Sequence, residues 1–382
     1  MKYTGLVIGD IHWDAFDANT LYSELIYAFI QKIESMDNLH FIIINGDYFD
    51  RKLYMNTTSA LLSIEFMDNL VSIIREKHPD TKIRILYGTE SHDAGQLKIF
   101  ESYVSSNSID FKIIYTVTEE ELFPKVNVLY IPEELVRNKN SHYDDYLLKE
   151  NHYDFIFGHG AIQEAMTYLK DSNHDSTRLH SPVFSSAEFE FACKGYTIFS
   201  HYHINTEIGN KVMYTGSFSR WQHGEEEDKG YYEVTVDSKK KEYTRNFINN
   251  IKARKFITFY YGYNSSIFKD KDLLYKEFGH IDEIINEKLI EYIRLVINIP
   301  VDYEDAEFFI KYINQKYALN KNITVDITNG YVAKKQEESK EKIRDIYDKY
   351  GFIFDKSMKV EDKISEFIQV RYEKSITPQT IL

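Results

Sequence analysis

The chain has 382 residues, of which 43% are hydrophobic and 28% charged, as expected for a folded protein of two or three domains. Its formal net charge of −14 argues against a broad nucleic-acid-binding surface, although bound divalent cations would invert the local field at a site. The single cysteine, Cys193, excludes an internal disulfide and a cysteine-based zinc site. No apolar run approaches the length of a membrane span, so we expect a cytoplasmic protein.

Residues 1–251 alternate predicted strands with predicted helices, which is the pattern of an α/β domain. Short apolar runs predict strands over residues 3–8, 41–45, 82–87, 126–131, 154–157 and 196–200. Apolar residues at helical spacing predict helices over 20–35 and 58–77. Further along, the pattern becomes hairpin-like, and strands are expected over 211–215 and 230–236.

The character of the chain changes near residue 252. Residues 252–330 predict a small α+β domain, with strands over 256–261, 292–299 and 323–327 and helices over 270–286 and 306–317. Residues 334–382 are strongly charged and predict a helical tail, with helices over 335–349 and 360–372. Three parts are therefore expected: 1–251, 252–330 and 334–382.

Five short motifs follow or close predicted strands of the first part: Asp10-Ile11-His12, Gly46-Asp47-Tyr48-Phe49-Asp50, Ser91-His92-Asp93, Gly158-His159 and His201-Tyr202-His203. Side chains at strand ends converge on one edge of a sheet. Mixed carboxylate and imidazole ligands suit a pair of divalent cations, which can bind a phosphate and activate a water. Each motif alone is common in turns, but five in this order predict a two-metal phosphoesterase site.

The residues divide into ligands and a proton donor. Asp10 and His12 point the same way from a strand end, and Asp47 is the natural bridging ligand. The later histidines are expected to complete both coordination shells; they are His159, His201 and His203. His92, flanked by Asp93, remains as the candidate catalytic donor of a proton to the departing oxygen.

These motifs resemble those of the calcineurin-like metallophosphoesterases, and the whole chain is similar to the Mre11/SbcD nuclease branch, especially its phage-encoded members. The resemblance covers residues 1–251 and includes the segment Tyr214-Thr215-Gly216-Ser217 after the last histidine pair. It implies a metallophosphoesterase sandwich of two β-sheets flanked by helices. It also implies a capping domain over 252–330 and a tail, 334–382, that docks on a partner.

Carried over by position, the resemblance implies one ion held by Asp10, His12, Asp47 and His203. The second ion would be held by Asp47, His159, His201 and a residue in the family's asparagine position. That asparagine is replaced here, because the family's Gly-Asn-His-Asp/Glu appears as Gly88-Thr89-Glu90-Ser91-His92-Asp93. We expect Ser91 as a direct or water-bridged ligand, or Glu90 as the source of the missing oxygen.

The resemblance implies a manganese-dependent DNA nuclease, with magnesium as the alternative ion, in an Mre11–Rad50-like or SbcCD-like complex for DNA end processing, recombination or repair. Its partners would be DNA, a Rad50/SbcC-like ATPase bound by the tail, and a second copy of the chain, in the cytoplasm of a bacterial host if phage-encoded. Aromatic residues predicted to stack on bases are Tyr48, Tyr202, Phe218 and Trp221.

Two alternative functions stay open. Arg51 follows the Asp47 motif, as in phosphatases that bind a phosphate with an arginine, and so favours a phosphatase for phosphoproteins or small phosphate esters. Ser91 in the asparagine position favours a non-catalytic assembly subunit with a weakened metal site.

Overall fold

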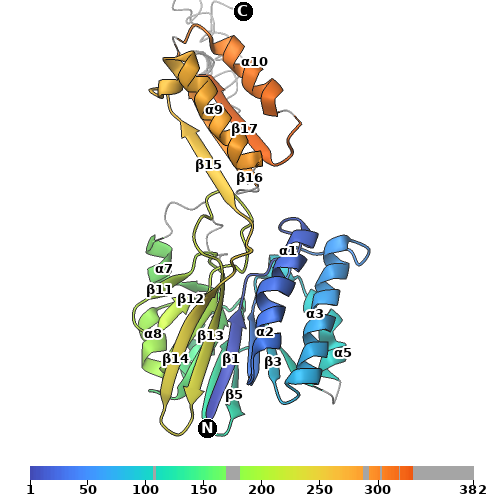
Figure 1. The fold of residues 1–382 in the computed structure, drawn as a ribbon. Helices are drawn as coiled ribbons and strands as arrows, with labels where there is room; N and C mark the ends of the chain where they lie inside the picture. The colour runs from blue at the N-terminus through green and yellow to red at the C-terminus, as the bar shows by residue number, and fades with distance from the viewer. Residues whose placement is uncertain (106–108, 169–180, 287–291, 302, 318, 330–382) are drawn as a thin grey trace, which may run out of the picture. The chain divides into compact units, whose positions relative to one another are not determined.

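The computed structural model describes residues 1–329 apart from 106–108, 169–180, 287–291, 302 and 318 (Figure 1). The two helices predicted in the tail, 335–349 and 360–372, lie outside the described residues. The chain divides into two compact units, Met1–Phe256 and Ile257–Leu382, and this boundary lies close to residue 252, where the sequence changes character.

Unit 1 is an α/β domain with two six-stranded sheets (Figure 1). The first has the order β14-β13-β1-β2-β3-β4, with bounds β1 Lys2–Ile8, β2 Phe41–Asn45, β3 Lys82–Leu86, β4 Asp110–Ile114, β13 Gly230–Asp237 and β14 Glu242–Asn249. The second has the order β11-β12-β10-β7-β6-β5, with bounds β5 Thr118–Phe123, β6 Val126–Ile131, β7 Tyr153–His159, β10 Cys193–Ser200, β11 Thr206–Ile208 and β12 Val212–Tyr214.

Both sheets are mixed. Strands β1 to β4 are parallel to one another, and so are β6, β7, β10 and β12. Strands β13 and β14 extend the first sheet in antiparallel pairing, and β5 and β11 do the same for the second. The carboxyl ends of the central parallel strands therefore lie at one edge of each sheet, and the predicted motifs follow these ends.

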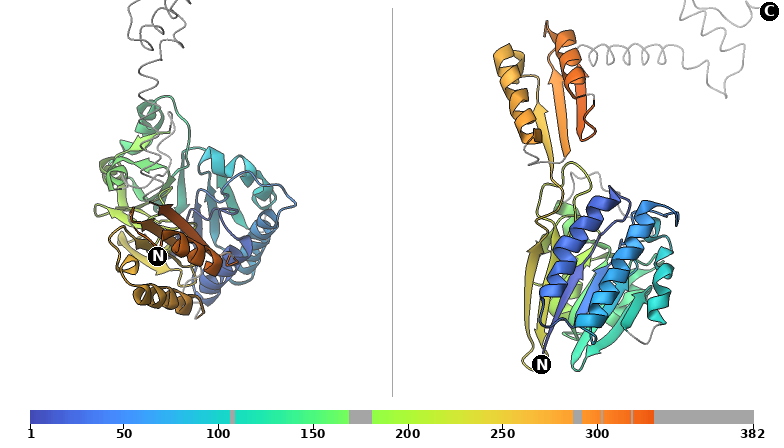
Figure 2. Two further views of the ribbon diagram at one scale, coloured as in Figure 1. Left: turned by 90° about the horizontal axis from the view of Figure 1, so that it is seen from above. Right: turned by 45° about the vertical axis from the view of Figure 1, so that its right-hand side comes forward.

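Helices flank the two sheets (Figure 2). One continuous helical stretch comprises α1 Ala18–Glu24, the π-helical Leu25–Ile30 and α2 Gln31–Ser35. The other main helices are α3 Thr58–Lys77, α6 Lys139–Leu147 and α8 Ser186–Ala192. Shorter elements are α4 Glu90–Asp93, the 3₁₀ turn Gln96–Phe100, α5 Glu101–Val104, β8 Ala161–Ile162, α7 Gln163–Tyr168 and β9 Val183–Phe184. None of the described helices is both long and apolar enough to cross a membrane.

Successive side chains along the central strands face opposite sides of each sheet and therefore pack into different cores. In β2, Phe41 and Ile43 pack in the core between the sheets, whereas Ile42 and Ile44 pack against the α1–α3 side. In β7, Phe155 and Phe157 also face the core between the sheets. The order of layers is therefore helices, sheet, sheet, helices.

The two sheets are joined at the ends of their parallel strands. The Asn45 amide, at the end of β2, donates to the carbonyl of Ile198 in β10 at 3.0 Å and to the Ser200 hydroxyl at 3.3 Å. All three residues are buried. These bonds bring the motifs from both sheets to a common place.

Sequence patterns found the central strands but missed edge strands. Strand β14 alternates exposed and half-buried residues, and β5 contains the charged run Glu119–Glu121, so neither forms a continuous apolar run. The helix predicted over 20–35 is observed as one helical stretch, divided by the π-helical turn Leu25–Ile30.

Unit 2 has the predicted order of elements. Its sheet is β15-β16-β17, with β15 Phe256–Tyr261 beginning at the unit boundary, β16 Tyr292–Ile299, β17 Ile323–Asn329, and helices η3 Ser266–Phe268, α9 Lys271–Asn286 and α10 Ala306–Tyr317. Strands β16 and β17 are parallel. Leu295 and Ile297 of β16 share one core with Phe278 of α9 and Phe309 of α10, so both helices pack on the same sheet.

A buried ion pair links the two sheets of unit 1 at one edge. Arg84 of β3 is fully buried and donates to both carboxylate oxygens of Glu120 in β5, at 2.8 and 2.7 Å. Burial by itself would raise the pKa of Glu120, but hydrogen bonds and charge from Arg84, supported by Lys112, lower it to about 2.

We expect Glu120→Gln to lower the free energy of unfolding at pH 7 by about 1–3 kcal/mol, because the buried Arg84 loses its bidentate carboxylate partner and keeps only the more exposed Asp110, at 2.9 Å. Because the folded pKa lies below the ordinary value of 4.5, the stabilisation is complete above pH 4.5 and is lost as the pH falls toward 2. Urea denaturation at pH 7 and 3.5 measures both effects. Glu242→Gln is the matched control, since Glu242 is exposed and 3.9 Å from Lys240. An equal loss in the two variants contradicts the prediction.

Candidate metal centre

The backbone is strained where the predicted ligands lie. Four of them have positive φ values: 47° at Asp10, 51° at His12, 45° at Asp47 and 122° at His201. Side-chain-bearing residues rarely adopt this conformation, which costs about 1–3 kcal/mol for each residue. Such strain clusters at functional sites, where neighbouring structure enforces it. Here the loops enforce it together, since Asp10 N donates to Gly46 O at 3.2 Å and His12 N donates to Asp47 O at 3.0 Å.

Two glycines allow these loops to approach closely. Gly46 has a φ of 84°, and a Cβ at this position would lie 2.3 Å from His159 Nδ1. A Cβ at Gly88 would lie 2.2 Å from the backbone nitrogen of Asp47. A side chain at either position would push Asp47 and His159 apart.

Asp47 lies between two groups of ligand atoms. Its Oδ2 is 3.6 Å from His12 Nε2 and 3.2 Å from His159 Nε2. Among the described residues, three sets have ligand atoms within 4.8 Å of one another, and Asp47 belongs to two of them: Asp10, His12, Asp47 and Asp47, His159, His201. The third set is His12, Asp50 and His92. Asp47 is therefore near both groups of ligand atoms, as a bridging ligand would have to be.

His203 joins the first group. Its Nε2 lies 3.1 Å from His12 Nε2. The Asp10 carboxylate, in turn, accepts the backbone N–H of His201 at 3.1 and 3.0 Å, and its Oδ1 is 3.8 Å from His159 Nδ1. All six residues predicted as ligands from the Asp10, Asp47, His159 and His201 motifs therefore meet in one place.

Oxygen atoms lie behind three of these imidazole rings. Those behind His159 and His203 are hydrogen-bonded to Nδ1, whereas the one behind His12 forms an ion pair with Nδ1 and no hydrogen bond. His12 Nδ1 lies 3.4 Å from Asp50 Oδ1, His159 Nδ1 lies 3.0 Å from the Asn45 carbonyl, and His203 Nδ1 lies 3.1 Å from Glu225 Oε1. A proton on each Nδ1 satisfies these oxygens and turns each Nε2 lone pair toward the cluster, as is usual for histidines that bind metals.

The arrangement fits divalent cations. With Nδ1 protonated, His12 and His203 direct two Nε2 lone pairs at each other across 3.1 Å, which is repulsive unless a proton or cation lies between them. Two nitrogens about 2.1 Å from one ion, at a right angle, lie about 3 Å apart. In addition, Nδ1 of His201 is buried and has no hydrogen-bond partner among the described residues. Nitrogen and carboxylate donors without sulfur suit manganese and similar ions.

Burial has the largest single effect on the pKa values of Asp10, His159 and His203. Burial, with a smaller contribution from the neighbouring Asp47, raises the pKa of Asp10 to about 7, although the charge of His159 lowers it. For His159, burial disfavours the charged form, but Asp47 and Asp10 raise the pKa to about 10. Burial lowers the pKa of His203 to about 4. His159 therefore holds a proton that a bound cation would displace.

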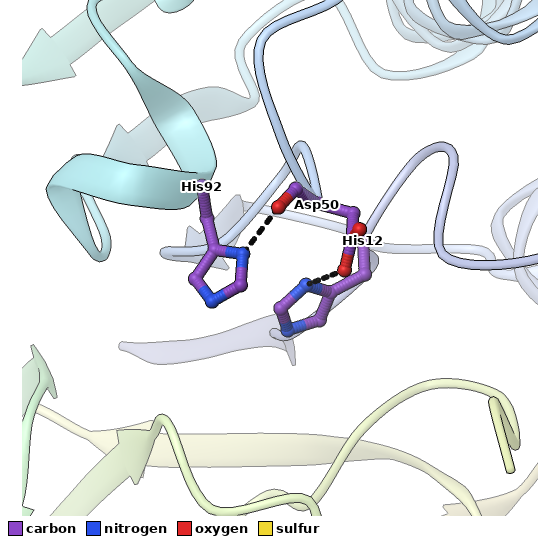
Figure 3. Close-up of side chains that lie close together, drawn as sticks. All are labelled: His12, Asp50 and His92. Carbon is purple, nitrogen blue, oxygen red and sulfur yellow. Dashed lines mark hydrogen bonds and ion pairs between the residues drawn. The ribbon is translucent and has the colours of Figure 1, made fainter. Parts of the chain in front are cut away.

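His92 lies beside this cluster on the one-turn helix α4 (Figure 3). Its Nδ1 is hydrogen-bonded to the backbone carbonyl of Asp50, and its ring is 4.8 Å from the ring of His12 at an interplanar angle of 90°. Asp50 thus holds two histidines, His12 through its carboxylate and His92 through its carbonyl.

Ser91, Glu90 and Asp93 do not lie among the ligand atoms of the cluster. Ser91 lies exposed at the cavity wall, and Glu90 is exposed and accepts from the Tyr87 hydroxyl at 2.6 Å. Asp93 is buried and accepts the backbone N–H groups of Phe49 at 3.1 Å and Gly88 at 2.8 Å. Asp93 therefore braces the loops that carry Asp47 and His92, and does not face the ligand atoms.

Thr89 lies where Ser91 was expected. Its backbone N–H donates to Asp47 Oδ1 at 2.6 Å, and its hydroxyl is 3.2 Å from Asp47 Oδ2 and 2.9 Å from Glu133 Oε2. Thr89 is the N-cap residue of α4, yet its hydroxyl makes no capping bond. The hydroxyl is turned to the carboxylates.

Sequence analysis also missed three acidic residues. Glu133 follows β6 by two positions, so the strand-end rule that found the other motifs applied to it. Asp50 lies inside a recognised motif but was not assigned a contact. Glu225 has no sequence signal, because it reaches His203 from a loop between β12 and β13.

A cavity of about 390 Å³ opens over the cluster, and its wall includes His12, Asp47, Thr89, His92, Glu133, His201, His203, Arg51, Tyr202 and Trp221. Of the aromatic residues predicted to stack on bases, Tyr48 and Phe218 are fully buried and cannot do so. Tyr202 and Trp221 remain at the cavity.

Comparison with known proteins adds no assignment. No protein-family model matches the chain, and a search of curated proteins finds no match either. The interpretation of the centre depends on its geometry.

We expect Asp50→Ala to weaken Mn²⁺ binding about 10- to 100-fold, since the His12 ring loses the oxygen that orients it. The substitution keeps the backbone carbonyl that holds His92, so the effect reports on the Asp50 carboxylate, which lies beside His12 and belongs to the set His12, Asp50, His92. Isothermal titration calorimetry measures the affinity. Asp37→Ala removes an exposed carboxylate outside the cavity wall and serves as the control. Equal affinities in the two variants would show that Asp50 does not support a metal ligand.

Proposed function

We propose that this protein is a metal-dependent phosphodiesterase, specifically a manganese-dependent DNA nuclease subunit of the Mre11/SbcD branch, with magnesium as the alternative ion. One observation carries the proposal: Asp10, His12, Asp47, His159, His201 and His203 meet around Asp47, beside His92. The sandwich of two mixed sheets flanked by helices supports the metallophosphoesterase fold.

The residues divide the chemistry among them. Two divalent ions held by the cluster would activate a water and neutralise charge on a bound phosphate. The attacking water would lose one proton to solvent as its oxygen bonds to phosphorus. The bond to the leaving oxygen would break, and His92 would donate its Nε2 proton to that oxygen. Since His92 Nδ1 is bonded to the Asp50 carbonyl, the ring presents Nε2 on its opposite side.

The organisation of the chain supports a polymer substrate. Unit 2 is a separate α/β unit with its own core, and we assign it as a capping domain that orients DNA. We assign residues 334–382 to docking on a Rad50/SbcC-like ATPase, and the active form to a homodimer. The proposal places the reaction in DNA end processing, recombination or repair.

A phosphatase is the second candidate, and Arg51 favours it. This guanidinium is 60% exposed at the cavity wall and lies 3.6 Å from Asp14 while it pairs with Asp50. An arginine at the cavity wall would pair with the additional negative charge of a terminal phosphate, which an internal phosphodiester lacks.

End-labelled duplex and hairpin DNA, incubated with the full chain and Mn²⁺, tests the proposal. We expect cleavage that a chelator abolishes, increased by an ATPase partner encoded nearby. Hydrolysis of a phosphomonoester without cleavage of single- or double-stranded DNA would establish the phosphatase instead. Mn²⁺ binding with neither activity would leave the assembly role.

We expect His92→Ala to lower the cleavage rate about 100- to 10,000-fold, the usual contribution of a general acid. The number of bound Mn²⁺ ions should stay as in the unchanged protein, because the proposal makes His92 a proton donor and not a ligand. Rates on labelled DNA and Mn²⁺ stoichiometry are measured on the same preparations. His152→Ala, at an exposed position, is the control. A rate equal to the control would remove His92 from its assigned role.

A further inference from the structure

We infer that Glu133 is a ligand of the second metal ion and takes the place of the asparagine oxygen that the chain lacks. The inference rests on the proposed metal centre and extends it by a residue outside all five sequence motifs. Its consequence is that the second ion is held by an anionic oxygen in place of a neutral amide.

Glu133 lies among the atoms expected around that ion. Its Oε2 is 3.6 Å from His159 Nε2 and 3.6 Å from His201 Nδ1. The side chain is only 7% exposed, and it forms part of the cavity wall beside Asp47. An ionised carboxylate that is so little exposed needs positive charge nearby. Within the described residues, the groups that can supply it are the histidines His159 and His201.

The fold fixes the direction of this carboxylate. Glu133 follows β6 after Pro132, and its backbone N–H donates to the Tyr87 carbonyl at 3.0 Å, which ties it to the loop after β3. The Ser181 hydroxyl donates to Oε1 at 3.1 Å, so that Oε2 is the oxygen directed at His159 and His201.

Thr89 links Glu133 to the bridging carboxylate. Its hydroxyl is 2.9 Å from Glu133 Oε2 and 3.2 Å from Asp47 Oδ2. A hydroxyl has one proton, so it donates to one of these oxygens at a time and offers its lone pairs to the centre. Thr89 therefore positions the two carboxylates on the same side of His159, whose Nε2 is 3.4 Å away.

The exchange of an amide for a carboxylate changes the charge of the centre. Asp10, Asp47 and Glu133 together supply three negative charges to two divalent ions, where a site with asparagine would supply two. An additional hard oxygen favours manganese or magnesium over softer ions. If Glu133 supplies this oxygen, the centre does not need Ser91, the residue aligned with the asparagine. Ser91 accordingly lies exposed at the cavity wall.

Three variants of the full chain test this inference by Mn²⁺ binding, with calorimetry for affinity and electron paramagnetic resonance for the coupling of paired ions. In Glu133→Ala, we expect one ion to bind as before and the second about 10- to 100-fold more weakly, with loss of the paired-ion signal. Glu133→Gln keeps an oxygen of the same reach, so an intermediate affinity is expected. Glu90→Gln, the same change at the exposed alternative position, should bind like the unchanged protein.

Each result has one meaning. Two ions of unchanged affinity in both Glu133 variants would overturn the inference while leaving the proposed function standing. Weaker binding in Glu90→Gln alone would assign the missing oxygen to Glu90. No Mn²⁺ binding by the unchanged protein would overturn the proposed function and this inference together. Far-ultraviolet circular dichroism checks folding, and the near-isosteric Glu133→Gln keeps the test valid if Glu133→Ala does not fold.

Discussion

Two carboxylates buried at the meeting point of both sheets are the constraint around which unit 1 is arranged. Asp10 is inaccessible to solvent and Asp47 is 2% exposed. Burying an ionised carboxylate is unfavourable by several kcal/mol unless positive charge and hydrogen-bond donors compensate. The histidines hold the pKa of Asp47 well below its ordinary value against the effect of burial, whereas burial raises the pKa of Asp10 to about 7. Cations would satisfy both groups at once.

This constraint explains the local backbone. Strand β1 ends at Ile8 and β2 at Asn45, and the chain then turns sharply so that Asp10 and Asp47 face each other. The turns require positive φ at residues that ordinarily avoid it. Gly46 has no side chain, and a Cβ at this position would overlap with His159. The large apolar cores on both sides of the sheets supply the stability that offsets this strain.

Groups that contact the histidines from behind determine how the imidazole rings of the centre are oriented. Asp50, Glu225 and the Asn45 carbonyl set the orientation of three imidazoles, and Asp93 fixes the loops around them. None of these groups needs to touch a substrate. They decide instead which nitrogen of each histidine faces the cluster, and so determine whether the same residues bind ions or merely pair with one another.

The sequence by itself determined the central strands and the six candidate ligands that follow them, because apolar runs and strand-end motifs are local features that parallel topology brings together. Only the tertiary structure decided which residue of the loop after β3 faces the cluster. Residues 90–93 form a helical turn, which leaves Ser91 and Glu90 exposed and turns the N-cap Thr89 inward. It also revealed Glu225, whose contact with His203 depends on a distance between segments far apart in the chain, which no local pattern encodes. Glu133 follows the end of β6, so a local pattern was present, but its distances to His159 and His201 came only from the structure.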